Sequence, residues 1–131
     1  MTAKNDSLVV ATATATLTHS KDKHKGSFNI VDKFPNNRYK VYGKMHGEHK
    51  ATQCIPLPGA GCTPVVVSYP DGDVDTAFKD KSFSETVTIS VDKSNGRYGR
   101  PGVGTLLTRA RVCEATVWYW HACSSWKSFS G

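Results

Sequence analysis

The chemistry open to this sequence depends first on how its histidines and cysteines are spaced. His46 and His49 precede Cys54 and Cys62, and four such side chains could in principle bind zinc. A two-residue gap between the histidines, followed by widely spaced cysteines, matches no standard zinc pattern, so we expect a solvated histidine pair at a strand end and no metal. We expect the remaining histidines at surface or edge positions: His19, His24 and His121.

Catalytic motifs are absent from the sequence. It contains no Gly-x-Ser-x-Gly elbow, no phosphate-binding Gly-x4-Gly-Lys loop and no His-Glu-x-x-His pair. Gly102-Val-Gly104 is too short a glycine pattern to indicate a nucleotide site. The sequence therefore predicts a protein that binds and assembles, without enzymatic activity and without a cofactor.

A basic face is the strongest candidate binding surface. From residue 38 to residue 45, cationic and polar side chains alternate with Tyr39, Val41 and Met45, which places the two groups on opposite faces of a strand. A second alternating segment adds hydroxyl groups at Thr86 and Thr88. Such a surface suits phosphates and one stacked base, although a solvated face that discourages edge aggregation would have the same composition. The predicted RNA-binding residues are Arg38, Lys40, Tyr42, Lys44, Thr86 and Thr88.

The four cysteines form two groups with different expectations. Cys54 and Cys62 bracket a loop rich in proline and glycine, and they could either close that loop within one chain or link neighbouring copies. Cys113 and Cys123 lie among small and aromatic residues, where buried free thiols are the expected state.

The elements that must carry these residues follow from periodicity. Residues 8–18 alternate alanine with threonine, which predicts a half-buried strand that forms a hairpin with residues 28–34. The pattern predicts further strands over residues 65–69 and 85–91. Apolar residues from Val103 to Trp120 fit helical spacing and predict a C-terminal helical region over 103–127, with a strand over 115–120 as the competing interpretation.

These elements predict one α+β domain over residues 1–131, mostly β up to residue 91. An antiparallel sheet would be covered on one face by the helical region, and dimers would form through joined sheets. The aromatic cluster near the C-terminus is typical of a subunit interface. The predicted interface residues are Val117, Trp118 and Trp120.

The charge balance favours polyanionic partners. Lys and Arg outnumber Asp and Glu by 17 to 11, which gives a net charge of +6 and a pI near 9.2. No apolar run approaches the ~18 residues that a membrane span requires. We therefore expect a soluble chain with no membrane partner.

Three stretches resemble the coat proteins of single-stranded RNA bacteriophages. They are Asn37 to Val41, the Cys54–Cys62 loop with Pro64 and Val65 after it, and Thr86 to Val91 before a terminal helical region. The resemblance covers roughly residues 36–120. It implies a dimer whose helices are swapped over a joined sheet, an inner face that meets the genome, and a virion assembled in the cytoplasm of a bacterial host.

Particular residues acquire roles from this resemblance. Arg38, Lys40, Tyr42 and Thr86 match positions that contact an RNA hairpin, and some family members link the cysteine loop between subunits. The family's stacking tyrosine has no counterpart, because Ser84 occupies that position, so base stacking would fall to Tyr42.

Two functions follow. The leading prediction is a capsid protein that dimerises, assembles into an icosahedral shell and binds genomic RNA. The alternative is a secreted cationic β protein, bonded by disulfides, that acts as a toxin or effector. The alternative requires all four thiols to be paired within one chain.

Overall fold

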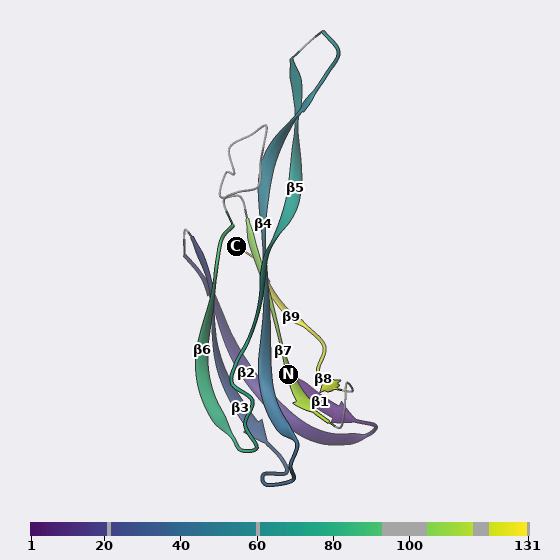
Figure 1. The fold of residues 1–131 in the computed structure, drawn as a ribbon, viewed down its shortest axis with the longest axis vertical. Helices are drawn as coiled ribbons and strands as arrows, with labels where there is room; N and C mark the ends of the chain where they lie inside the picture. The colour runs from purple at the N-terminus through teal and green to yellow at the C-terminus, as the bar shows by residue number, and fades with distance from the viewer. Residues whose placement is uncertain (21, 60, 93–104, 117–120, 131) are drawn as a thin grey trace.

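A computed structural model describes residues 1–20, 22–59, 61–92, 105–116 and 121–130. These residues form nine β-strands in two antiparallel sheets and contain no helix (Figure 1). The four-stranded sheet has the order β1 (Thr2–Asn5), β2 (Leu8–His19), β3 (Lys23–Asp32) and β6 (Phe83–Ser90). Within this described part, no helix exists that could cross a membrane.

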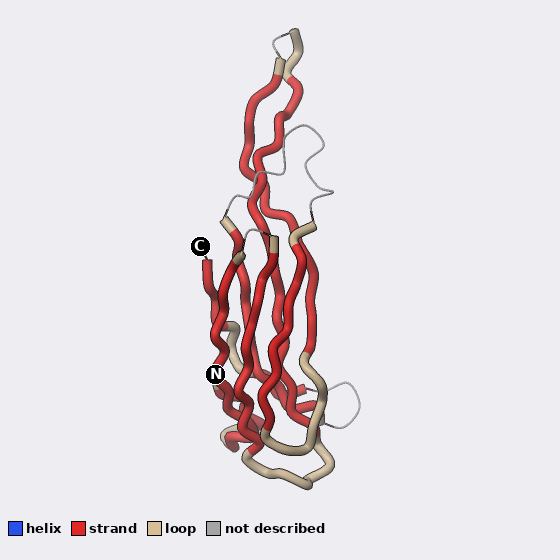
Figure 2. The backbone as a smooth tube through the Cα atoms, turned by 90° about the vertical axis from the view of Figure 1, so that its left-hand side faces the viewer, coloured by secondary structure: helices blue, strands red, loops and turns tan. Residues whose placement is uncertain are grey.

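The second sheet contains the two longest strands. Its order is β5 (Cys62–Asp75), β4 (Lys40–Pro56), β7 (Leu106–Ala115) and β8 (His121–Cys123), and β9 (Lys127–Ser130) also pairs with β7. Figure 2 shows the strands of both sheets running along the same long axis of the molecule. Strands within ~30° of one another are typical of an aligned β-sandwich.

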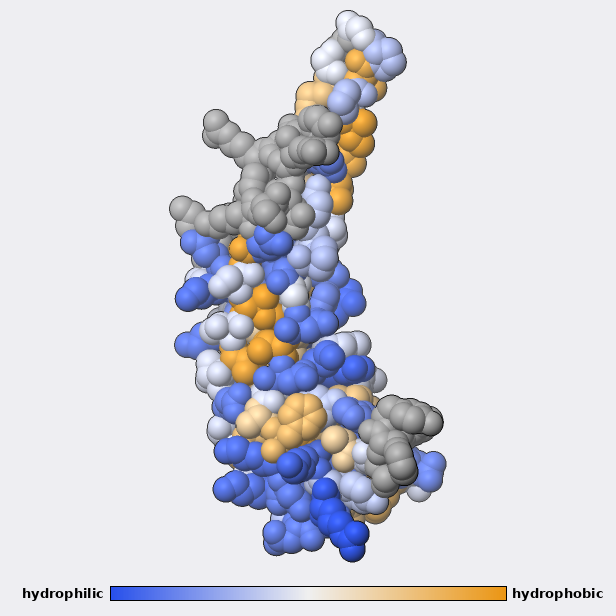
Figure 3. Space-filling model, in the orientation of Figure 1, coloured by the Kyte–Doolittle hydropathy of each residue, from blue (hydrophilic) through white to orange (hydrophobic). Residues whose placement is uncertain are grey.

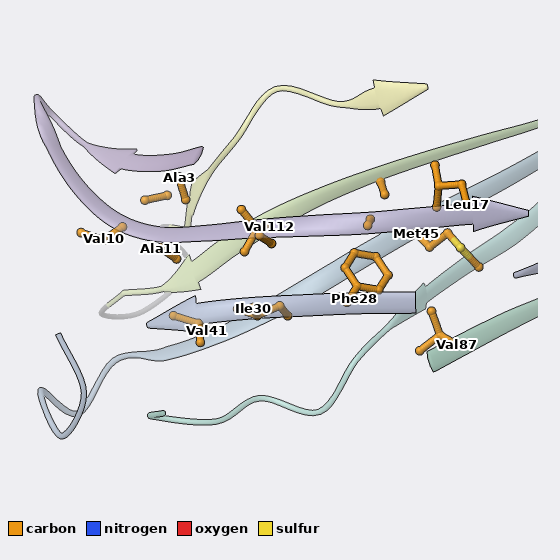
Figure 4. Close-up of a cluster of buried hydrophobic side chains, with 14 of the residues drawn as sticks. Ala3, Val10, Ala11, Leu17, Phe28, Ile30, Val41, Met45, Val87 and Val112 are labelled. Atoms are coloured by element: carbon orange, nitrogen blue, oxygen red, sulfur yellow. The ribbon is translucent and has the colours of Figure 1, made fainter. Parts of the chain in front are cut away.

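The predicted hairpin of the N-terminal half is confirmed. β2 pairs with β3 from Ala11↔Asp32 to His19↔His24. The alanines of β2 face the core while its threonines point outward, because successive side chains of a strand alternate between faces. The small alanines of β2 share the core with larger side chains from β3 and β7, among them Phe28, Ile30 and Val112 (Figure 4).

Close approach of the two sheets depends on glycine. A Cβ atom added at Gly43 would lie 2.5 Å from the Phe28 ring, and one added at Gly26 would lie 2.7 Å from the Met45 sulfur. Neither position has space for a larger residue. The two sheets therefore approach each other closely where β3 faces β4.

The predicted α+β class and the C-terminal helical region are wrong. β7 pairs with β4 over ten residues, from Lys40↔Ala115 to His49↔Leu106, so residues 106–115 form a central strand. Leu106 and Ala110 are four residues apart, a spacing that satisfies both a helix and a strand, and pairing with β4 selects the strand. No helices cover a sheet face in the described residues, and the predicted interface residues Val117, Trp118 and Trp120 lie outside them.

Candidate functional site

The most distinctive feature of the molecule is a hairpin that extends beyond the sandwich, formed by residues 50–70 and called the arm below (Figures 1 and 2). β7 pairs with β4 only as far as His49↔Leu106. Beyond that point β4 continues to Pro56 with β5 as its ladder partner. A two-stranded hairpin is marginally stable in water, so the arm needs additional restraints.

A disulfide supplies one restraint at the tip. Cys54 and Cys62 are bonded to each other within the chain, with Cα atoms 5.4 Å apart. The Leu57 amide donates a hydrogen bond to the Gly61 carbonyl across the turn, at 2.8 Å. Of the two possibilities left open by the sequence, the structure has the pairing within one chain.

The second cysteine pair corrects an expectation. Cys113 and Cys123 form a disulfide inside the sandwich and are not free thiols. The cause is the antiparallel register of β7 and β8, which places these two residues directly opposite each other with Cα atoms 4.1 Å apart. Surroundings of small residues indicate burial, and a buried cysteine can be either a disulfide or a free thiol.

From residue 51 to residue 70 the arm carries no charged side chain and exposes several aliphatic ones. Residues 51–70 include no Asp, Glu, Lys, Arg or His, whereas 21% of the whole chain is charged, which would give about four such residues in twenty. Ile55 and Leu57 are each 45% exposed and Val66 is 67% exposed. Figure 3 shows hydrophobic residues along the arm. An exposed apolar patch on a projecting element is typical of an interaction site.

The outer edge of the arm is protected against strand addition. The Lys50 amide donates to the Thr105 carbonyl on the β7 side, so even-numbered residues of this part of β4 direct their backbone groups away from β5. The register then directs the backbone groups of Pro64, Val66, Ser68 and Pro70 toward the free edge of β5. Proline lacks an N–H, so its presence at both ends of this edge discourages a further strand.

A buried polar network lies where the arm leaves the sandwich. The side chain of Asp71, in β5 at the base of the arm, is fully buried, and its carboxylate accepts hydrogen bonds from His24 Nε2 at 2.6 Å and His49 Nδ1 at 2.5 Å. The Asp92 amide donates to the same carboxylate at 2.9 Å. His24 was expected at the surface or an edge, and that expectation is wrong, because it is fully buried.

Thr108 extends this network into β7. With His24 donating to Asp71 from Nε2, its Nδ1 accepts from the Thr108 hydroxyl at 2.7 Å. The same hydroxyl lies 2.6 Å from His19 Nε2, which therefore donates to it. Burial, together with the neighbouring His24, lowers the pKa of His19.

The network fixes the arm to the sandwich. Its members come from β2, β3, β4, β5 and β7, so one group of hydrogen bonds joins both sheets. A bulge between Gly47 and Glu48 lies beside it in β4, and a Cβ atom at Gly47 would come within 2.8 Å of the His24 ring. Bulges bend strands and increase their twist, so this position directs the arm away from the sandwich.

The four side chains considered as zinc ligands have other partners. Cys54 and Cys62 are bonded together. His49 was expected to be solvated, and that expectation is wrong, because His49 is buried and belongs to the network. His46 lies on the outer face of β4, beside Glu48 and Asp73. Burial lowers the pKa of His46, but its hydrogen bonds to these carboxylates outweigh burial and raise the pKa above its usual value. No cluster of metal-ligating side chains exists among the described residues.

The predicted RNA-binding residues are divided between two surfaces. Lys40 and Lys44 point outward from the five-stranded sheet, whereas Thr86 and Thr88 point outward from the four-stranded sheet on the other side of the sandwich. Arg38 precedes β4 in a loop and has a φ of 74°. The structure therefore does not bring the six residues into one face, and RNA binding stays a prediction.

Tyr42 is not positioned to stack on a base. Its side chain is 4% exposed, because the Phe78 ring covers it with ring centroids 4.0 Å apart. The hydroxyl is 2.5 Å from His121 Nδ1. Burial and the nearby Asp75 raise the pKa of Tyr42.

Comparisons with known proteins leave the function open. No described protein family matches the sequence, and no curated protein matches it. Among solved structures, the chain is similar to a beta-glucosidase from Kluyveromyces marxianus in complex with glucose, at 14% sequence identity and a TM-score of 0.34. The match covers 94% of this chain and 14% of that chain. A similarity this low carries no argument about fold or function.

Sequence reasoning missed the arm and the network for different reasons. The uncharged stretch was visible in the sequence, but its prolines and glycines favoured a loop. The network joins residues that are 47 and 84 positions apart, as in His24 with Asp71 and His24 with Thr108. No local pattern indicates such contacts.

Proposed function

We propose that this chain is a secreted, cationic β protein of the toxin or effector class that attaches to target cells through its arm. The observation that carries the proposal is the projecting hairpin whose residues 51–70 carry no charge and expose Ile55, Leu57 and Val66. Exposed aliphatic groups are costly in water, and a soluble protein retains such a patch where a partner covers it.

Both cysteine pairs support this function over a coat protein. All four cysteines are paired within one chain, which is the condition that distinguished the effector from the capsid. Disulfides form and persist in oxidising compartments, outside most cytosols. Where a coat-protein dimer would need helices, the described residues form the sheet strands β7 and β8.

Cell binding tests the proposal directly. Fluorescently labelled protein is added to bacterial, yeast and animal cells, and bound fluorescence is measured against the double variant Ile55→Ser/Leu57→Ser. We expect at least tenfold weaker binding of the double variant to the cell type that the wild type recognises. These side chains are already exposed, so the substitutions leave the core intact.

The matched control is Leu8→Ser. Leu8 is 54% exposed and lies at the start of β2, at the opposite end of that strand from His19 and the buried network. It should bind cells as the wild type does. Equal binding by the double variant and the wild type would refute attachment through the arm, as would the absence of binding to every cell type.

A further inference from the structure

We infer that the surface bound by the arm is a lipid bilayer with anionic headgroups, and that the tip enters its interfacial layer while the sandwich remains in water. This inference rests on the proposed function and names the chemistry of the target. It differs from a membrane span, because only the end of a hairpin leaves water.

The side chains of the tip suit this environment. Ile55 and Leu57 flank Pro56 at the end of the arm, and Pro58 follows directly. These residues carry no charge and no polar side-chain atom, so their transfer from water removes no side-chain hydrogen bond. Burial of exposed aliphatic surface is the main favourable contribution when amphipathic elements bind at a bilayer interface.

Prolines reduce the number of backbone donors at the tip. Pro56, Pro58 and Pro64 have no N–H, and the Leu57 amide donates to the Gly61 carbonyl. Ile55 and Thr63 face each other in the ladder. A backbone group that enters an apolar layer must be satisfied internally, and the prolines leave this tip with fewer N–H groups to satisfy.

The same rule limits the depth of insertion. Thr52 lies beyond the last β7 contact of β4 and directs its backbone groups toward an open edge, as does Val66 on β5. These groups require water. Ile55 lies three positions beyond Thr52, which is ~10 Å of strand, and interfacial elements bury ~5–10 Å. The inserted part therefore begins near Cys54.

Charge favours anionic lipid over neutral lipid. The chain carries a net charge of +6, and Lys50 immediately precedes the uncharged stretch of the arm. Lys23 and Lys25 are exposed on either side of His24, which belongs to the network at the arm base. The side chain of Asp71, the acid that begins the charged part of β5, is buried. A cationic body that follows an apolar tip is attracted to anionic headgroups.

A second copy of the chain is a poorer occupant. The free edge of β5 is bounded by Pro64 and Pro70, so a copy could not add a long strand there. A protein receptor that covers the aliphatic tip is the remaining alternative, and the experiment below separates it from lipid.

Vesicle co-sedimentation tests the inference with the full, oxidised chain. Vesicles of phosphatidylcholine alone are compared with vesicles that also contain phosphatidylserine. We expect binding to the mixed vesicles, at least tenfold weaker binding to phosphatidylcholine, and at least tenfold weaker binding of Ile55→Ser/Leu57→Ser to the mixed vesicles. Leu8→Ser should bind as the wild type does. Binding that is absent, or equal for the double variant and the wild type, overturns the inference.

A spectroscopic measurement reports insertion separately from attraction. Leu57→Trp should show a blue-shifted emission difference relative to the wild type on mixed vesicles, and brominated lipid should quench it. Leu8→Trp should show neither effect, because it lies on the sandwich. An unshifted and unquenched Leu57→Trp overturns insertion of the tip.

The two proposals fail in distinguishable ways. Cell binding that depends on the arm, without any vesicle binding, leaves the proposed function intact and assigns the target to a protein or glycan receptor. Loss of arm dependence on both cells and vesicles refutes the proposed function as well.

Discussion

At the scale of single residues, Asp71 is the most consequential side chain. It is a buried carboxylate held by two imidazoles, and no Lys or Arg takes part in the hydrogen bonds described for it. Asp71→Asn keeps the shape of the side chain but replaces one accepting carboxylate oxygen with an NH2 donor. That donor would face the N–H of one of the groups that now donate to Asp71. Because breaking a buried charged network costs ~3–5 kcal/mol, we expect the free energy of unfolding to fall by about that amount.

Chemical denaturation measures this change. Asp75→Asn is the matched control, because Asp75 lies on the same strand and is exposed. Its effect should stay within ~0.5 kcal/mol. A variant Asp71→Asn as stable as the wild type would show that the network does not hold the arm base to the sandwich.

Two other buried acids predict a pH dependence of stability. Burial raises the pKa of Glu114, and Asp32 and Asp80 nearby raise it further, against a hydrogen bond from Asn37. Burial likewise raises the pKa of Asp32, partly offset by the Phe34 amide. A folded pKa above the unfolded value destabilises the protein fully above the folded pKa, and this cost disappears as the pH falls toward the unfolded pKa.

Glu114→Gln should therefore be more stable than the wild type at neutral pH, and the difference should shrink as the pH falls through the folded pKa of Glu114. Unfolding by denaturant at several pH values measures it. Asp6→Asn, which changes an exposed carboxylate, should alter the free energy of unfolding by the same small amount at every pH measured. A constant difference between Glu114→Gln and wild type over this range would contradict the assignment.

At the scale of elements, the two disulfides should have different effects. Cys54–Cys62 closes a short loop at the end of the arm, whereas Cys113–Cys123 joins two strands of the sandwich. Removing a disulfide costs ~2–5 kcal/mol when the restrained region unfolds with the domain. An arm that opens locally contributes less to global unfolding.

We therefore expect Cys113→Ser/Cys123→Ser to lower the thermal unfolding midpoint substantially. Cys54→Ser/Cys62→Ser should change it little but should accelerate hydrogen exchange in residues 50–56 and 62–68. Differential scanning calorimetry and exchange mass spectrometry provide the two readouts. The prediction fails if both pairs shift the midpoint equally, or if exchange in the arm is unchanged.

The elements also show which parts of the fold are readable from sequence. The alternation of alanine and threonine in residues 8–18 fits only a period of two residues, so the strand and its hairpin were predicted correctly. Residues 106–115 were misassigned, because apolar residues four apart fit two periods and only pairing with β4 decides between them. The arm was missed because prolines at an unpaired edge are compatible with a strand, although within a sequence they resemble a loop.

At the scale of the whole molecule, both disulfides lie within one chain, whereas a coat protein of the kind described above could link neighbouring chains through its cysteine loop. A cysteine loop that linked neighbouring subunits would give ladders of covalent oligomers on a non-reducing gel. Here every cysteine is already bonded inside its own chain, so none remains for a neighbour.

We expect one monomer band with and without reductant, and no alkylation by iodoacetamide in denaturant until reductant is added. Peptide mapping should recover Cys54 with Cys62 and Cys113 with Cys123. Covalent ladders that collapse on reduction would contradict this pairing and would favour the capsid, because a chain linked to its neighbours is built for assembly, whereas an arm closed on itself remains available for a target surface.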